Sequence, residues 1–184
     1  MAGPPHSLVL VVDADIAKAA GPDPKDRPWP ESSKDCHDLL EAVRQGGYRV
    51  AFDRRLKSEW DKHAGRTATQ WLANMVASRR IERIAGDADT GWVVSMIESR
   101  LLRQDRPAAR KDAHLVALAD DPGDGRIFSN DRKARAKFAD IPEPRISIIH
   151  WTAASGESAE WLSHGAPDKP EWTLGGAAQN SENE

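Results

Sequence analysis

The sequence predicts a three-layer α/β fold in which helices flank a central, parallel, twisted sheet. Short apolar runs such as Leu8–Val12 do not alternate with polar residues as half-exposed strands do. Continuous apolar runs are typical of strands buried on both faces of a parallel sheet. Between these runs, apolar residues recur at spacings of three and four, as on one face of a helix. Strands that alternate with helices in this way are characteristic of parallel α/β architecture.

The order of the elements follows from apolar spacing and from turn-forming residues. Strands are expected over 8–12, 48–52, 126–129 and 146–151. Proline, glycine and aspartate clusters predict loops over 21–32, 46–47, 86–90 and 120–125. The apolar spacing predicts helices from an N-cap at Ser33 to Val43, and over 56–62, 71–81, 92–101, 108–119 and 131–138.

The length of 184 residues favours one domain, which we assign to residues 1–152. Residues 153–184 are rich in Gly, Ser, Ala, Pro and Glu and have no sustained period, so we expect a mostly unstructured, flexible C-terminal tail. Trp161 and Trp172 favour a different interpretation, a segment that covers the domain or a second subunit, because large aromatic side chains usually bury their rings.

Cysteine usage and the N-terminus bear on the cellular compartment. Cys36 is the only cysteine, which rules out an intramolecular disulfide and a cysteine cluster for zinc or iron–sulfur binding. Residues 1–7 carry no basic start, and the run 8–12 is too short for a signal-peptide core or a membrane span. We therefore expect a cytoplasmic protein that is neither secreted nor inserted in a membrane.

Positive charge is concentrated in the middle of the chain. The net charge is −3, but residues 49–145 hold 20 Lys and Arg against 15 Asp and Glu, while the remainder holds 6 against 14. Phosphate recognition needs local rather than net positive charge, so this distribution permits contact with a polyanion. The same residues also suit solvated helix faces.

Acidic residues stand where strands are expected to end. Asp13 follows the first strand, Asp131 follows the third, Glu59 lies in the helix after the second, and Asp112 lies in the helix that precedes the third. Ligands of open α/β sheets gather beyond the carboxyl ends of the strands, so these carboxylates could converge. Mg²⁺ and Mn²⁺ prefer such hard oxygen ligands, neutralise a phosphodiester and lower the pKa of a bound water.

Four segments together resemble the ordered acidic signature of PIN domains. They are Val11–Ile16, Ser58–Trp60, Lys111–Ala119 and Ile127–Asp131, and the resemblance covers roughly residues 8–151. Each match is short, and the signal lies in their order, spacing and position relative to strands and helices. Many members of this family are metal-dependent ribonucleases, and some are toxins of bacterial toxin–antitoxin pairs.

The resemblance implies a metal-dependent endoribonuclease. Asp13, Glu59, Asp112 and Asp131 would bind Mg²⁺ or Mn²⁺ and activate a water, and Ser129 would support the last carboxylate. RNA is the implied substrate, and an antitoxin protein is a possible partner of a member of this family. PIN-like domains also often self-associate, and the helices that carry Trp71 and Trp92 are rich in bulky apolar residues, so we expect a homodimer.

The sequence departs from the common family pattern at Asp15. It is also longer than a minimal toxin of this family, because of the proline-rich loop and the C-terminal tail. Asp15 stands where many members carry Ser or Asn, and both a further metal ligand and a helix cap are consistent with it. Structural roles also exist for the other acids. Asp13 and Asp131 suit helix N-caps, Glu59 suits a solvent-facing helix position, and Asp112 suits a partner of the helix dipole.

Basic residues flank two of the acidic positions. Arg110 and Lys111 precede Asp112, and Arg132 and Lys133, with Arg135 beyond them, follow Asp131, so this group is our candidate for binding the RNA backbone. Solvated helix faces explain these charges equally well. His114 is not assigned to catalysis, because residues two apart on a helix face different directions.

Two other functions compete with the nuclease. A haloacid-dehalogenase-like phosphatase would use Asp13 as nucleophile and Asp15 as acid, with the 120–125 turn as its later acidic motif, but there the strand follows the turn instead of preceding it. A PIN-like module that binds RNA or a partner without cutting is the other alternative. Four clustered carboxylates argue against it, because like charges without a metal would be destabilising.

Overall fold

The computed structural model describes residues 8–21 and 30–179, so most of the predicted 21–32 loop lies outside the described residues. The strands are β1 (Val9–Val12), β2 (Arg49–Phe52), β3 (Ile81–Arg83), β4 (Arg126–Phe128) and β5 (His150–Thr152). The helices are α1 (Ala14–Ala19), α2 (Glu31–Gln45), α3 (Arg54–His63), α4 (Arg66–Ala77), α5 (Gly91–Arg100), α6 (Arg106–Asp120), α7 (Arg132–Ala139), α8 (Pro144–Ser147), α9 (Gly156–Ser163), the 3-10 helix η1 (Pro170–Trp172) and α10 (Leu174–Gln179).

Within these residues the strands form one five-stranded sheet in the order β3-β2-β1-β4-β5. All neighbouring strands pair in parallel, for example with Val9 opposite Arg49 and Val11 opposite Ile127. β1 lies at the centre and all four of its residues are buried, as expected for a strand covered on both faces. The predicted α/β class with a parallel sheet is therefore confirmed.

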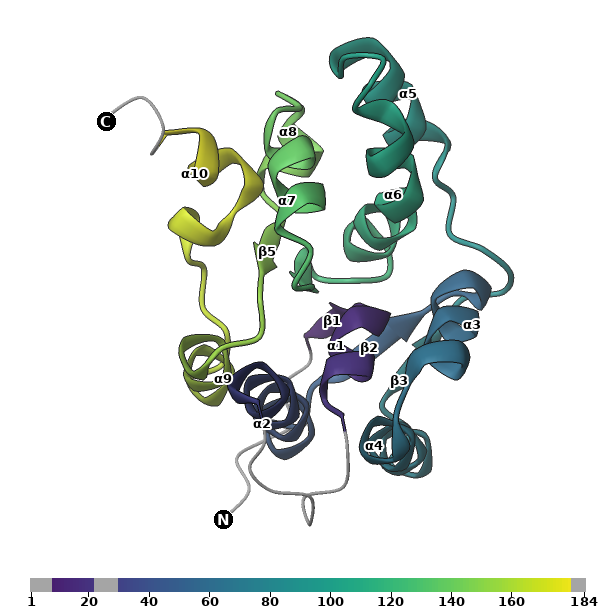
Figure 1. Cartoon of the computed structure of the whole chain (residues 1–184), viewed down its shortest axis with the longest axis vertical. Coiled ribbons are helices and arrows are strands. Elements are labelled where there is room, and N and C mark those ends of the chain that lie inside the picture. Colours follow the sequence, from purple (N-terminus) through teal and green to yellow (C-terminus); the bar gives the residue numbers. More distant parts are fainter. Residues whose placement is uncertain (1–7, 22–29, 180–184) are drawn as a thin grey trace.

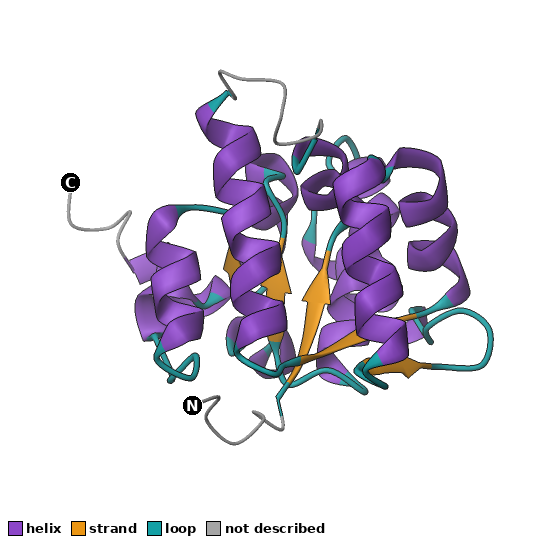
Figure 2. Cartoon of the chain, turned by 90° about the horizontal axis from the view of Figure 1, so that it is seen from below, coloured by secondary structure: helices purple, strands orange, loops and turns teal. Residues whose placement is uncertain are grey.

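Helices cover both faces of the sheet (Figure 2). The helices α5, α6, α7, α8 and α10 lie above the strands in Figure 1, and α2, α4 and α9 lie below them. Parallel strands require crossover connections, and these helices supply them. Because all strands run the same way, their carboxyl ends meet at one edge of the molecule, where Asp13 follows β1.

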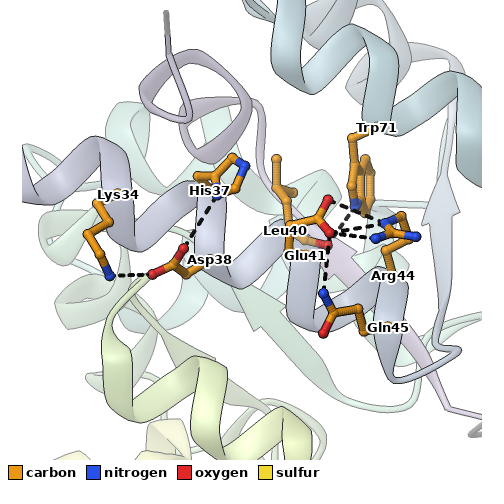
Figure 3. Close-up of polar contacts among 8 residues, drawn as sticks. All are labelled: Lys34, His37, Asp38, Leu40, Glu41, Arg44, Gln45 and Trp71. Carbon is orange, nitrogen blue, oxygen red and sulfur yellow. Dashed lines mark hydrogen bonds and ion pairs between the residues drawn. The ribbon is translucent and has the colours of Figure 1, made fainter. Parts of the chain in front are cut away.

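Aromatic side chains fill the core between β2, α3 and α4. Trp60 stacks on Trp71 with ring centroids 5.5 Å apart, and Phe52 meets Trp60 edge-on at 5.4 Å. Both indole nitrogens donate to backbone carbonyls, Trp60 to Val12 at 3.0 Å and Trp71 to Leu40 at 2.6 Å (Figure 3). Burying a tryptophan without such an acceptor would cost about 1–3 kcal/mol, so these bonds fix α3 and α4 against β1 and α2.

Three predicted boundaries are wrong. Ile81, assigned to a helix, begins β3, because α4 ends at Ala77 and Arg79 turns the chain with a φ of 57°. The strand expected over 146–151 is divided into α8 and a shorter β5, since Pro144 at the first turn of α8 favours a helix there. Ser33 is not the N-cap of α2; the helix begins earlier, with Pro30 as N-cap.

The expectation of an unstructured tail is wrong for residues 153–179. These residues form α9, η1 and α10, and α9 lies beside α2 in Figure 1. Trp161 and Leu162 are buried, and the Tyr48 hydroxyl donates 2.6 Å to the Leu162 carbonyl. Composition suggested disorder, whereas the apolar side chains of this segment complete the core around β4 and β5. Residues 180–184 lie outside the described residues.

On the two helices on which the homodimer expectation depended, Val76 of α4 is exposed, whereas the two tryptophans are largely covered by the protein itself. Trp71 is only 3% exposed, and Trp92 packs under the Arg145 guanidinium, whose carbon lies 3.9 Å from the ring centroid. Trp71 therefore supports the monomer's own core and not a second subunit. Among the described residues, no helix combines the length and apolar character that crossing a membrane requires.

Candidate functional site

Five carboxylates from four segments of the chain line one pocket of about 280 Å³ beyond the carboxyl ends of β1 and β4. They are the five acidic residues that the sequence suggests as metal ligands: Asp13, Asp15, Glu59, Asp112 and Asp131. Since these residues are separated by as many as 118 positions in the chain, the fold and not local sequence brings them together. The structure thus places all five acids around one pocket.

The chain geometry that follows β1 and β4 directs two of these acids into the pocket. Asp13 comes directly after β1 with extended backbone, and its amide donates to the Phe128 carbonyl at 2.9 Å. Asp131 is the N-cap of α7, and its Oδ1 accepts from the Ala134 amide at 2.9 Å. The capping role suggested for Asp131 is therefore present, and its second carboxylate oxygen remains for the pocket. The Asp13 side chain makes no capping bond to α1.

The Ser129 hydroxyl contacts the carboxylates of Asp13 and Asp15 and not that of Asp131. Its hydroxyl oxygen lies 2.8 Å from Asp13 Oδ2, to which it donates, and 3.3 Å from Asp15 Oδ2. The backbone amide of Asp131 donates to the same hydroxyl at 3.2 Å. The expected support of the last carboxylate is thus corrected: Ser129 joins the backbone of Asp131 to the side chain of Asp13.

Asp15 is half-buried inside the first turn of α1 and is not its N-cap. Its Oδ2 accepts from the Asn130 amide at 2.8 Å, while its Oδ1 is buried and has no hydrogen-bond partner among the described residues. Asn130 is itself fixed by the Ala154 amide, which donates to its side-chain oxygen at 2.9 Å. A buried, unpaired carboxylate oxygen beside other carboxylates is a candidate ligand atom.

Burial and mutual repulsion raise the pKa values of three of these acids. The pKa of Asp112 is raised to about 7, first by burial and then by the negative charges of Asp13 and Asp131. The pKa of Asp15 is raised to about 7 by burial and by the charge of Asp13. Burial also raises the pKa of Asp13, against the opposing effect of the Ser129 hydrogen bond. Ionising these three carboxyl groups together is therefore destabilising without a positively charged partner.

Glu59 differs from the other acids because Arg55 already donates a hydrogen bond to one of its oxygens and the His114 ring lies beside the other. Its Oε1 lies 3.2 Å from Arg55 Nε, and its Oε2 lies 3.3 Å from His114 Nε2, without hydrogen-bond geometry in the second case. His114 is 2% exposed, and burial followed by the charge of Arg55 lowers its pKa. Neutral His114 thus lies beneath Glu59, a contact that the sequence reasoning missed.

Carboxylate oxygens are suitable ligands for a hard divalent cation, but the carboxylates of this pocket lie too far apart to share one. Within residues 8–21 and 30–179, no three His, Cys, Asp or Glu side chains are close enough to hold one metal ion as they stand. Like-charged carboxylates favour rotamers that separate their oxygens. Binding of one cation by Asp13, Asp112 and Asp131 would therefore require their carboxylates to come closer together than they are in this structure.

The basic residues expected to bind RNA have different surroundings. Lys111 lines the acidic pocket, Arg132 lines a neighbouring pocket, and Arg110 forms an ion pair with Glu98. Lys133 is exposed on α7. The pocket also contains two basic residues that the sequence reasoning missed, Lys18 and His63. Spacing could have revealed both, since Lys18 is three residues after Asp15 and His63 is four after Glu59 on the same helix.

The acidic turn that suggested a phosphatase lies at the other end of the sheet. Asp120 forms an ion pair with Arg145, and Asp124 Oδ2 accepts from the Val9 amide at 2.6 Å. Both acids line a pocket of about 710 Å³ together with Leu8, which precedes β1. Asp13 follows the opposite end of β1, so the turn does not share a site with the proposed nucleophile.

Comparisons of the chain with protein-family models, with curated proteins and with solved structures found no match.

Proposed function

We propose that the protein is a metal-dependent endoribonuclease that hydrolyses RNA phosphodiester bonds in the acidic pocket. The observation that carries this proposal is the convergence of five carboxylates on one pocket, where burial and mutual repulsion raise the pKa of Asp112 to about 7. Clustered carboxylates that destabilise one another are typical of sites that bind cations, because stability alone would not select such an arrangement.

In this proposal Asp13, Asp112 and Asp131 hold Mg²⁺ or Mn²⁺, and Asp15 contributes its unpaired Oδ1. A bound divalent cation would neutralise phosphodiester oxygens and lower the pKa of the attacking water. Ser129 keeps the Asp13 carboxylate in place by its 2.8 Å hydrogen bond. Glu59, held between Arg55 and His114, adds negative charge at the border of the pocket.

The choice of RNA as substrate depends on the cations around the acids. The two cations Lys18 and Lys111 line the same pocket, as does the His63 ring, and exposed basic side chains follow Asp131 on α7. Cations positioned beside a metal site suit an anionic backbone that passes over it. We extend the proposal to a cytoplasmic enzyme that forms a homodimer and is inhibited by an antitoxin protein, as its resemblance to PIN-domain toxins suggests.

The central test is hydrolysis of a fluorescently labelled single-stranded RNA in Mg²⁺ or Mn²⁺. We expect cleavage that leaves 5′-phosphate and 3′-hydroxyl ends, and no cleavage in excess EDTA. Asp13→Asn and Asp112→Asn should each abolish cleavage, because amides keep the shape of the side chains and remove the charge that attracts the cation. Cleavage in excess EDTA, or a wild-type rate for Asp112→Asn, would rule the proposal out.

Two variants act as controls for this test. Asp120→Asn removes a carboxylate of the turn at the opposite end of the sheet and should leave RNA cleavage unchanged, whereas a phosphatase that uses this turn would lose phosphomonoester hydrolysis. Asp131→Asn should lose cleavage yet keep the α7 cap, because Asn is as good an N-cap as Asp. Asp131→Ala should lose cleavage and also about 1 kcal/mol of stability.

A further inference from the structure

A second pocket of about 510 Å³ adjoins the acidic pocket, and Asp131 lines both. Arg132 and Arg135 of α7 form one wall of the second pocket, and Trp151 and Trp172, from β5 and η1, form another. The C-terminal segment that we expected to be unstructured therefore builds part of this pocket. A chain bound in the acidic pocket can continue into the second one past Asp131.

Two residues that line this pocket each carry a buried hydrogen-bond donor that has no acceptor among the described residues. Arg135 Nε and Trp151 Nε1 are buried, and neither has a hydrogen-bond partner among the described residues. Both atoms carry a hydrogen and can only donate. Buried donors are nearly always paired, and an unpaired one is destabilising. A ligand whose acceptor oxygens reach these two donors would satisfy them.

Two arginines without a described ion-pair partner favour an anion in this pocket, although the carboxylates of Asp131 and Glu157 also line it. No described residue forms an ion pair with Arg132 or Arg135, whereas Glu157, a carboxylate that also lines the pocket, is already paired with Lys169. Burial lowers the pKa of Arg135, since its guanidinium is partly withdrawn from water and no carboxylate contacts it. An arginine that is buried without a counterion is destabilising by itself, and a bound anion would relieve this.

We propose that the pocket formed by Arg132, Arg135 and Trp151 binds the backbone phosphate that neighbours the bond cut in the acidic pocket. This inference builds on the proposed ribonuclease activity and names the place where the strand is held. Arginine presents a planar fork of donors that matches phosphate oxygens, and phosphate oxygens only accept hydrogen bonds here. Arg135 in this proposal binds substrate and takes no part in the chemistry.

Binding is tested without cleavage, by fluorescence anisotropy of a labelled decauridylate RNA in excess EDTA. We expect Arg135→Gln to weaken RNA binding about 10-fold, because a hydrogen-bonded charge pair with phosphate is lost. The slope of log K against log salt concentration should fall by about 0.7, the value for one phosphate contact in a single strand. Unchanged affinity and slope in Arg135→Gln would overturn the inference.

The matched control is Arg79→Gln. Arg79 is exposed, precedes β3 at the opposite edge of the sheet, and forms no ion pair with a described residue. Arg79→Gln removes the same charge as Arg135→Gln, but far from the pocket, so RNA affinity should change less than 2-fold. A loss equal to that of Arg135→Gln would mean that only net charge matters, and the pocket would lose its assignment.

Folding and ligand source are controlled separately. Arg135→Met should melt at the wild-type temperature or above it, since an unpaired buried charge is removed, whereas a merely structural Arg135 would make this variant less stable. Inorganic phosphate should displace the RNA only at millimolar concentrations. If Arg135→Gln abolishes phosphate binding but not RNA binding, the pocket is a site for free phosphate and the inference fails.

The two proposals can fail independently. If the wild-type protein cleaves RNA with Mg²⁺ but Arg135→Gln binds RNA as tightly as the wild type does, the activity stands and the phosphate pocket is wrong. If the wild-type protein binds RNA through Arg135 but cleaves none in Mg²⁺ or Mn²⁺, the pocket stands and the nuclease proposal is wrong.

Discussion

The Ser129 hydroxyl donates a 2.8 Å hydrogen bond to Asp13 Oδ2 and accepts one from the Asp131 amide at 3.2 Å. It thereby connects the residues that end β1 and β4, neighbouring strands of the sheet. The side chain is 2% exposed, so water cannot easily replace these bonds. Their strength therefore bears directly on the position of the Asp13 carboxylate.

Ser129→Ala should lower the free energy of unfolding by about 1–2 kcal/mol, because a buried amide and a carboxylate each lose a partner. RNA cleavage should fall about 10–100-fold at fixed Mg²⁺ and recover partly at higher Mg²⁺, as expected for a residue that positions a ligand. Urea denaturation and initial rates measure the two effects. Ser163→Ala, which removes an exposed hydroxyl bonded to the Glu160 carbonyl and to the adjacent His164 ring, should change neither. Equal effects of both variants would refute the role of Ser129.

The raised pKa of Asp112 predicts a pH-dependent effect of its removal. A folded-state pKa of about 7 against an ordinary value of 3.8 means that stability present below pH 4 is lost as pH rises through 7. Asp112→Asn should therefore stabilise the protein in EDTA at pH 8, on the order of 2 kcal/mol after allowance for solvent screening, and hardly at all at pH 4.

Urea denaturation at the two pH values measures this difference. Mg²⁺ at pH 8 should stabilise the wild-type protein and have less effect on Asp112→Asn, because a cation that binds the folded state shifts unfolding by mass action. Asp168→Asn is the control: its side chain is 88% exposed, so the change should stay within about 0.5 kcal/mol at both pH values. A gain for Asp112→Asn that does not depend on pH would show that ionisation of this buried carboxyl is not its cause.

Local sequence predicted those helices, strands and turns that are marked by the spacing of apolar residues or by turn-forming residues. The buried run at β1 and the acids that follow β1 and β4 could be placed because strand and helix periods are visible in a single sequence. The turn before β3 was missed because Arg79, and not glycine or proline, adopts its positive φ of 57°. Ile81 was therefore assigned to the preceding helix.

The parts of the site that were missed depend on tertiary contacts. The contact between His114 and Glu59 joins α6 to α3, and the unpaired Arg135 depends on which carboxylates are absent from its surroundings. The composition of the C-terminal segment suggested disorder, but a few large side chains such as Trp161 bury enough area to order this polar stretch. Neither period nor spacing encodes such contacts.

Tyr48→Phe tests the attachment of this C-terminal segment. The Tyr48 hydroxyl donates to the Leu162 carbonyl in a buried contact between the start of β2 and α9. Its removal leaves that carbonyl without this donor and should reduce the free energy of unfolding by about 1–2 kcal/mol. Amide hydrogen exchange should accelerate in α9 more than in β1. Uniform acceleration along the chain would show that α9 unfolds only together with the sheet.

Glu59 provides the sharpest test of how the acidic pocket is organised, because Arg55 already donates a hydrogen bond to one of its oxygens. A carboxylate held in this way adds charge to the site without being its main ligand, so Glu59→Gln should reduce RNA cleavage by about 10–100-fold. Asp112→Asn, which removes a carboxylate that has no such partner, should reduce cleavage by more than about 100-fold. Initial rates at several Mg²⁺ concentrations compare the two variants.

The matched control for Glu59→Gln is Glu41→Gln. Glu41 lies on α2 and accepts hydrogen bonds from Arg44, at 2.7 Å from its Nη2, and from Gln45 (Figure 3), so the variant also removes a helical glutamate paired with arginine. It lies outside the acidic pocket, and the cleavage rate should not change. If Glu59→Gln is as inactive as Asp112→Asn, Glu59 is a metal ligand in its own right. If it cleaves at the wild-type rate, Glu59 only pairs with Arg55, and the site consists of the aspartates alone.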